Sequence, residues 1–224
     1  MVSNIDPIPK AGCGVATEKD RWPAVSVLDC VGGEPKSELS FDQVQFERRS
    51  SRAFFSASLE DTCGVIRRVF GVQMTGTGSQ ANRVRKSVVS AGALHPIDVV
   101  IAAGPGVTEP IVFDDQANKF LCLPVRDGDA LKKATSRAYS VLPESDGHLL
   151  VFVGDLSRVS AHYSNPVSLL WRDAGAALQA CSMASFAYGY NFCPLGVLGA
   201  DVLSAIASVP PEREALGMAI IGKS

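Results

Sequence analysis

The chain has 224 residues, a length typical of one domain or of one large unit that mixes helices and strands. Hydrophobic residues make up 46% of it, enough to build a core, and the net charge of −2 gives no indication of binding to nucleic acid or to an anionic membrane. The six cysteines form no CxxC pair, which predicts reduced thiols of a cytoplasmic protein rather than disulfides or a metal site. The first ten residues lack the layout of a signal peptide, and no apolar run has membrane-spanning length.

The first forty residues are rich in proline, glycine and serine. We interpret residues 1–40 as an arm that lies on the main body, and residues 41–224 as one domain. Within the arm, Ala24–Leu28 has the composition of a strand and Gly32–Pro35 that of a loop.

Basic residues gather in the stretch ERRSSRAFF, where Arg48, Arg49, Ser50 and Arg52 lie within five positions. A run of charge is usually the solvated end of a helix. The alternative is an anion site, because guanidinium groups bind phosphate oxygens with paired hydrogen bonds and a serine hydroxyl adds a donor. The residues by themselves leave both interpretations open.

The middle of the chain mixes helical and strand patterns. Ser58 is a typical N-cap, with an acid three residues later, for a helix that ends at Gly71. The other expected elements are a polar loop at 73–82, a small-residue loop at 90–96, a strand at 97–103, a hairpin of 111–113 and 119–123, an amphipathic helix at 129–139 and a strand at 148–153. His95, in the small-residue loop, is expected to be structural and extended, because a proline follows it.

The stretch Leu169–Gly189 has helical length and is apolar nearly all round, which predicts a buried helix that ends at Gly189. Its small residues allow another backbone to come close. Residues 191–196 predict a rigid turn whose N–H groups face a ligand, followed by a helix at 202–207 and a strand at 215–221. Strands and helices do not alternate regularly, and neither GxGxxG nor the P-loop is present, so the fold class is α+β.

Four motifs in this order resemble the flavin-dependent nitroreductase superfamily, and most of all its SagB-type dehydrogenase branch, which includes the oxidases of azole-containing peptide biosynthesis. They are ERRSSRAF, SAGALHP, Tyr163 with RDAG at 172–175 and Gln179, and CPLG at 193–196. The resemblance covers residues 41–222. It implies a nitroreductase-like fold, with a central mostly antiparallel sheet flanked by helices, in an intertwined homodimer whose long central helix is the interface.

The resemblance also implies one FMN at each of two interface sites, bound by the domain 41–224, and no metal. The implied contacts are Arg48, Arg49, Ser50 and Arg52 with the phosphate and ribityl oxygens, Val89, Ser90, Ala91, Gly92 and Leu94 along the isoalloxazine ring, and Pro194, Leu195, Gly196 and Val197 at the N5 edge from the other subunit. The implied chemistry is hydride transfer between FMN and a substrate that stacks on the exposed ring face.

The chain departs from the family pattern at several positions. His162 and Tyr163 stand where azoline-oxidising members have a Lys-Tyr pair. Because histidine titrates near neutrality, His162 is a candidate base that Tyr163 assists; the alternatives are two ordinary surface residues or a different activity. Val89 replaces a proline, and Gly196 stands where simple nitroreductases often have Glu. The sequence stops soon after Lys223, so the phosphate contacts are expected to rest on the arginine cluster.

The leading hypothesis is an FMN-dependent oxidoreductase that acts on a heterocyclic or amino-acid- or peptide-derived substrate in a natural-product pathway, with other enzymes of a biosynthetic complex as further partners. One alternative is an NAD(P)H-dependent nitro- or quinone reductase. Another is a flavin-free scaffold subunit of such a complex.

Overall fold

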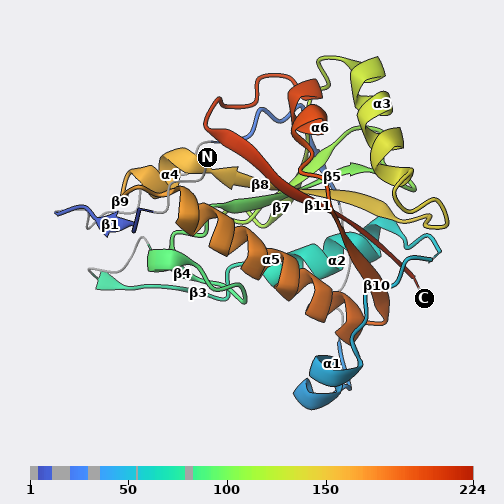
Figure 1. Ribbon diagram of the computed structural model, residues 1–224, viewed down its shortest axis with the longest axis horizontal. Coiled ribbons are helices and arrows are strands. Elements are labelled where there is room, and N and C mark those ends of the chain that lie inside the picture. The colour runs from blue at the N-terminus through green and yellow to red at the C-terminus, as the bar shows by residue number, and fades with distance from the viewer. Residues whose placement is uncertain (1–4, 12–20, 30–35, 54, 79–82, 224) are drawn as a thin grey trace.

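The computed structural model describes residues 5–11, 21–29, 36–53, 55–78 and 83–223, and these residues form a central antiparallel sheet covered by helices (Figure 1). The sheet has the strand order β10-β11-β8-β5-β6-β7-β2, and every neighbouring pair is antiparallel. Its strands are β2 (Ser26–Leu28), β5 (Ile97–Ala103), β6 (Ile111–Asp114), β7 (Lys119–Cys122), β8 (His148–Asp155), β10 (Tyr190–Leu195) and β11 (Arg213–Lys223). The expected α+β class and central antiparallel sheet are confirmed.

The helices are α1 (Phe41–Glu47), α2 (Leu59–Phe70), α3 (Gly128–Tyr139), α4 (Leu156–Ser160), α5 (Val167–Ala187) and α6 (Ala200–Ala205). The Ser58 hydroxyl accepts a hydrogen bond from the Asp61 N–H, which confirms the predicted start of α2, and Gly71 caps its other end. The helix predicted at 202–207 lies two residues earlier, as α6, while α3 matches its prediction within one residue.

The sheet separates two hydrophobic cores because alternate residues of each strand point to opposite faces. On one face, Leu150 and Phe152 of β8 pack with α2 and α5. On the other face, Leu149 and Val151 pack with α3 and α6. The strand β8 is buried along its whole length, as its continuous apolar run predicts. Both faces of the middle of the sheet are therefore occupied.

Helix α5 lies across one face of the sheet (Figure 1). It ends as predicted, because Gly189 adopts the left-handed conformation with φ 78° and its N–H bonds to the Phe186 carbonyl. Burial all round is not observed in the single chain: Ala174 and Ala177 are buried, whereas Gly175 and Gln179 are exposed. Helix α5 thus carries apolar and small residues on more of its surface than a single chain buries.

The prediction of a rigid turn at residues 191–196 is wrong. Residues 190–195 form β10, an edge strand in which Phe192 pairs with Ile221 and is fully buried. Proline and glycine at 194 and 196 indicate a turn locally, but an edge strand tolerates proline, whose missing N–H costs nothing on the unpaired side. Only Gly196 lies beyond the strand.

The N-terminal region contributes strands of its own. The predicted strand 24–28 is present as β2, which pairs with β7 at the edge of the main sheet, and β1 (Ile8–Pro9) pairs with β9 (Tyr163–Ser164). The polar loop predicted at 73–82 contains β3 (Met74–Thr75), which pairs with β4 (Val84–Arg85). The loop predicted at 32–35 lies outside the described residues, and so do residues 79–82.

Four cysteines, Cys63, Cys122, Cys181 and Cys193, lie in the described part of the chain, and no disulfide joins them there. Cys13 and Cys30 lie outside it. None of the described helices has both the length and the apolar character needed to cross a membrane.

Candidate functional site

The loop Ser90–Leu94 is fastened to the central helix by Asp173. The Ser90 hydroxyl donates to Asp173 Oδ2 at 2.5 Å, and the Ala91 N–H donates to Asp173 Oδ1 at 3.3 Å. Burial raises the pKa of the Asp173 carboxyl, while these two hydrogen bonds act in the opposite direction. The small residues of the loop form a single 3₁₀ turn, with Gly92 at φ 61°. The loop is thus preformed in the single chain.

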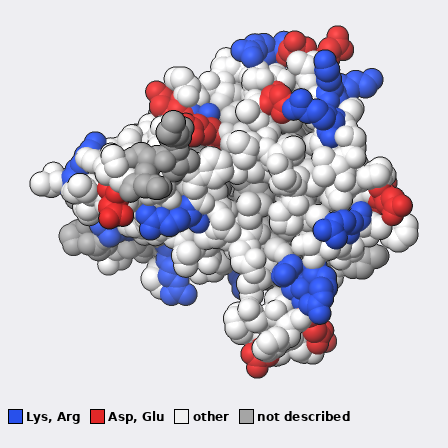
Figure 2. Space-filling view, in the orientation of Figure 1, with Lys and Arg blue, Asp and Glu red and all other residues white. Residues whose placement is uncertain are grey.

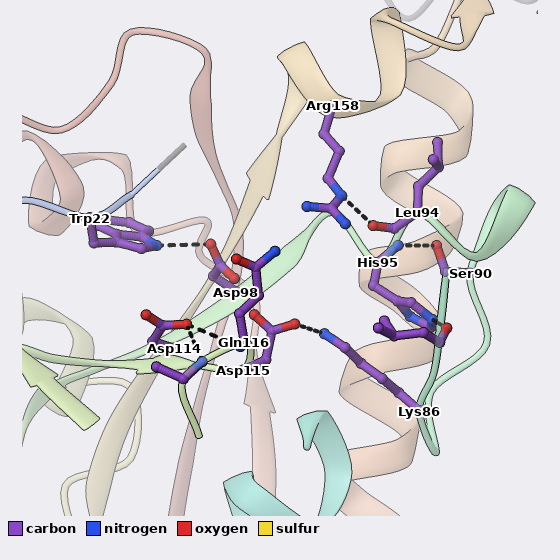
Figure 3. A network of polar contacts seen from close by, with 12 residues as sticks. Trp22, Lys86, Ser90, Leu94, His95, Asp98, Asp114, Asp115, Gln116 and Arg158 are labelled. Atoms are coloured by element: carbon purple, nitrogen blue, oxygen red, sulfur yellow. Dashed lines mark hydrogen bonds and ion pairs between the residues drawn. The ribbon is translucent and has the colours of Figure 1, made fainter. Parts of the chain in front are cut away.

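His95 closes this loop in a conformation that the sequence does not predict (Figure 3). Its φ is 48° rather than extended, and its N–H donates to the Ser90 hydroxyl at 2.9 Å. Its Nε2 donates to the Val84 carbonyl at 3.1 Å. Burial lowers the pKa of His95 to about 4, so the ring is neutral. The hydrogen bonds of a buried, uncharged ring fit the predicted structural role.

The other end of the loop is held by Arg158, a residue that the sequence analysis does not identify. Arg158 follows the end of β8 in the short helix α4, and its Nε donates to the Leu94 carbonyl (Figure 3). The side chain is 8% exposed, and its Nη1 has no hydrogen-bond partner among the described residues. Asp173 and Arg158 therefore hold the loop from both ends. No motif surrounds Arg158 that would have indicated this.

Tyr163 reaches the loop, whereas His162 is fixed by the preceding helix. A Cβ atom placed on Gly92 would lie 3.1 Å from the Tyr163 hydroxyl oxygen, so this glycine makes room for the phenol. His162 Nδ1 lies 3.2 Å from the Arg158 carbonyl. Because a carbonyl only accepts, Nδ1 is the donor of this hydrogen bond. Both predicted residues are half-buried.

The arginine cluster begins where α1 ends. Arg48 caps α1, and its Nη1 lies 3.5 Å from the Ser182 hydroxyl of α5. Arg49 folds back onto the carbonyls of Phe46 and of Arg48, as in a solvated helix end. Ser50 and Arg52 are exposed. Among the described residues, none of the three arginines has a carboxylate partner.

The segment 194–197 lies on the side of the arginine cluster. Burial raises the pKa of the Cys193 thiol of β10, and the charge of Arg52 partly offsets this effect. Pro194 and Gly196 are exposed, and the Val197 carbonyl accepts from the Met218 N–H at 3.1 Å. The N–H groups on the outer side of β10 face away from the sheet, because β10 is its edge.

The two halves of the predicted site lie on opposite sides of α5. Ser182 contacts Arg48, and Asp173 holds the Ser90 loop, nine residues earlier. Residues of a helix are offset by about 100° and 1.5 Å each, so nine residues make about two and a half turns, which puts the two side chains about 180° apart around the axis and about 13 Å apart along it. The arginine cluster and segment 194–197 thus share one flank, and the loop Ser90–Leu94 lies on the other. The resemblance implies a different grouping, with the loop and the arginines in one subunit.

Comparison with known proteins gives a result at the level of structure. No protein-family model matches the sequence, and no curated protein matches it. A candidate nitroreductase from Ralstonia eutropha superposes with a TM-score of 0.59 at 16% identity, over 100% of this chain and 96% of that one. A candidate nitroreductase from Exiguobacterium sibiricum, solved in complex with FMN, has a TM-score of 0.54 at 12% identity, over 85% of this chain and 90% of that one.

A third solved structure, a candidate NAD(P)H:FMN oxidoreductase from Staphylococcus epidermidis, has a TM-score of 0.54 at 12% identity, over 86% of this chain and 90% of that one. At such low identities a structural likeness establishes the fold alone. With the strand order and helix placement described above, it shows that this chain has the nitroreductase-like fold.

Proposed function

We propose that the protein is an FMN-dependent oxidoreductase that works as a homodimer and transfers hydride between bound FMN and a small-molecule or peptide-derived substrate. The observation that supports it most strongly is the pairing of an uncompensated arginine cluster with a preformed loop of small residues, on the fold of a protein solved with FMN. Neither half alone would indicate a flavin site, because charge runs and small-residue loops are common.

The arginine cluster has the chemistry of a phosphate site. Arg48 and Arg52 carry charges that no described carboxylate neutralises, and the exposed Ser50 hydroxyl lies between them in the sequence. A phosphate group provides several strong acceptors and about two negative charges, which suits two guanidinium groups and a hydroxyl. Arg49, whose guanidinium bonds to backbone carbonyls, is expected to contribute less.

A homodimer would complete the site. Because the loop and the arginine cluster occupy opposite flanks of α5, a two-fold pairing along α5 can bring the loop of one copy to the arginines of its partner. The face that carries α5 is mostly free of charge, with Lys and Arg as well as Asp and Glu at its edges (Figure 2). Phe41 and Phe46 of α1 are 69% and 74% exposed, and Gly175 has open space above it. Exposed aromatic and small residues of this kind are typical of an interface.

The side chains of this protein have assignable roles in such a site. FMN supplies the hydride chemistry when bound. Arg48, Ser50 and Arg52 bind its phosphate, and the backbone of 195–197 offers N–H groups to its polar edge. Tyr163, whose hydroxyl lies close to Gly92, donates or accepts a proton on the substrate. His162, whose Nδ1 lies 3.2 Å from the Arg158 carbonyl, acts as the base that Tyr163 assists.

We further propose a substrate of the SagB type, a heterocycle or an amino-acid-derived compound of a biosynthetic pathway, with other pathway enzymes as partners. The motifs SAGALHP and RDAG support this branch. A nicotinamide-dependent nitro- or quinone reductase is the second candidate, since one protein of this fold is a candidate NAD(P)H:FMN oxidoreductase. Rapid steady-state turnover of a quinone with NAD(P)H would favour the second candidate over the first.

Replacement of both Arg48 and Arg52 with Ala tests the proposal. The wild-type protein is expected to purify with, or take up, one FMN per chain, visible as a two-band absorption spectrum. The double variant should lose most of this flavin, because charge-assisted bonds to the phosphate contribute about 1.5–3 kcal/mol each. The matched control replaces Lys132 and Lys133, two exposed lysines of α3, and should retain flavin. Stoichiometric FMN in the double variant would refute the phosphate site, and a wild-type protein that takes up no FMN would favour the scaffold hypothesis.

A further inference from the structure

A cavity of about 620 Å³ opens at the end of α5 that lies away from the arginine cluster. Its walls come from α5, from α6 and from the chain that leads into β11. Trp171, Leu198, Ile206 and Val209 give it an apolar surface, and Arg126 and Glu214 also line it. None of these residues belongs to the motifs identified in the sequence.

The cavity lies in line with the proposed flavin site. Ser182, Leu178 and Trp171 are spaced by four and seven residues, which places them on one flank of α5. Ser182 contacts Arg48, Leu178 lies 3.5 Å from a Cβ placed on Gly217, and Trp171 lines the cavity. The cavity thus begins about 10 Å along α5 beyond Leu178.

The chain connects the cavity to the segment that is proposed to face the flavin N5 edge. Leu198 directly follows Val197, and the Val197 carbonyl is fixed by the Met218 N–H. A molecule in the cavity would therefore lie next to the reactive edge and at the opposite end from the phosphate. A substrate that exchanges hydride with the flavin must lie at this position. In this respect the further inference rests on the proposed function.

Two opposite charges remain uncompensated at the cavity. The buried Arg213 also lines it, but its charge is neutralised by ion pairs with Asp98 and, at 3.4 Å, with Asp155. The Arg126 guanidinium is oriented by a hydrogen bond to the Ser204 carbonyl and has no carboxylate partner among the described residues. Glu214 is exposed and likewise has no cationic partner there. The cavity thus offers an apolar interior with one positive and one negative group.

We infer that this cavity binds the zwitterion of an amino acid with a large apolar side chain. Arg126 takes the carboxylate, Glu214 takes the ammonium group, and the side chain packs against Trp171 and its apolar neighbours. A carboxylate suits the fork of donors on arginine, and an ammonium group suits an acceptor-only carboxylate. A purely apolar ligand would leave both charges without a role, and a dianion would be repelled by Glu214.

L-Tryptophan is the probe for this inference, with its methyl ester and indole-3-propionate as analogues that lack one charge each. Calorimetry on the full chain loaded with FMN is expected to show that L-tryptophan binds about tenfold more tightly than either analogue, as one charge-assisted hydrogen bond predicts. Arg126→Ala should abolish the preference over the ester and keep the preference over indole-3-propionate. Glu214→Gln should do the reverse.

Three further variants make the result independent of folding defects. Ser204→Trp, at an exposed position that lines the cavity, should abolish binding of all three compounds with little change in Tm. Lys133→Ala and Glu144→Gln remove exposed charges elsewhere and should change nothing. Failure of L-tryptophan to bind a protein that retains FMN would overturn the cavity assignment alone. Binding that both charge variants leave unaltered would overturn it as well. Tryptophan binding with the expected charge dependence in a protein that takes up no FMN would support the cavity and refute the proposed function.

Discussion

The two flanks of α5 differ in how completely their polar groups are satisfied. On the flank of the Ser90 loop, Asp173 and Arg158 hold the backbone from both ends, and the His95 N–H donates to the Ser90 hydroxyl. On the other flank, Arg48 is half-buried and Arg52 is exposed, and neither has a carboxylate partner in the part of the chain that the structure describes. The loop on the first flank is held in place before any ligand binds. The arginines on the second flank gain hydrogen-bond partners only when a ligand binds. A site that joins a preformed surface to an uncompensated charge is suited to a large anionic cofactor.

Removal of the Asp173 carboxylate should have the largest effect on the stability of the flank that carries the Ser90 loop. Asp173→Ala should lower the free energy of unfolding by about 3 to 5 kcal/mol, because the Ser90 hydroxyl and the Ala91 N–H lose a charged acceptor. Urea unfolding measures this loss. Asp173→Asn keeps one acceptor oxygen and should show about half of it. A change below 1 kcal/mol in the alanine variant would mean that the loop holds its conformation by other contacts.

Acidification should lower the free energy of unfolding through His95, which lies on the same flank. Its pKa is about 4 in the folded protein and near 6.5 in the unfolded chain, so only the unfolded state gains a proton between these values. Stability is therefore complete above pH 6.5 and should fall by about 2 to 3 kcal/mol as the pH drops to 4. His148, whose pKa burial also lowers, adds to the loss. Unfolding of His95→Gln across this range should show a shallower slope, and an unchanged slope would assign the effect elsewhere.

A smaller change tests the contact between the loop and Tyr163. Gly92→Ala should cost about 1 to 2 kcal/mol, because φ is 61° and the new Cβ would lie 3.1 Å from the phenol oxygen. Gly78 is the matched control, since it has a φ of 58° but no atom within 4 Å. Gly78→Ala should share the backbone cost and leave turnover intact. Equal turnover in both variants would show that the position of Tyr163 does not affect the reaction.

Removal of the Tyr163 hydroxyl is a separate test. Tyr163→Phe should slow turnover while the protein retains FMN.

The sequence predicted those parts of the fold that depend on local signals. The serine cap of α2, the hairpin of β6 and β7 and the glycine after α5 each involve residues a few positions apart. The strand β10 was missed because its partner β11 lies about thirty residues away, while Pro194 and Gly196 indicate a turn. Tertiary pairing overrode the local preference there.

The candidate site shows the same limit. The motifs identified the loop and the arginine cluster as candidate site residues. A sequence motif does not predict, however, on which side of α5 each of these segments packs. The φ of His95 could not be expected either, because the Ser90 hydroxyl that holds its N–H also bonds to Asp173, in a distant helix. Arg158 is a single charged residue in a five-residue helix, without a motif around it.

The pairing of β1 with β9 has a consequence for how this protein can change. Tyr163 lies in a two-residue strand pair opposite Pro9, a residue that has no N–H to donate, and the neighbouring Ile8 is exposed. Substitutions in residues 5–11 therefore act directly on the backbone next to Tyr163. Because β1 and β9 form a sheet of their own, substitutions in this segment are expected to shift Tyr163 while the strand pairing of the central sheet is unchanged.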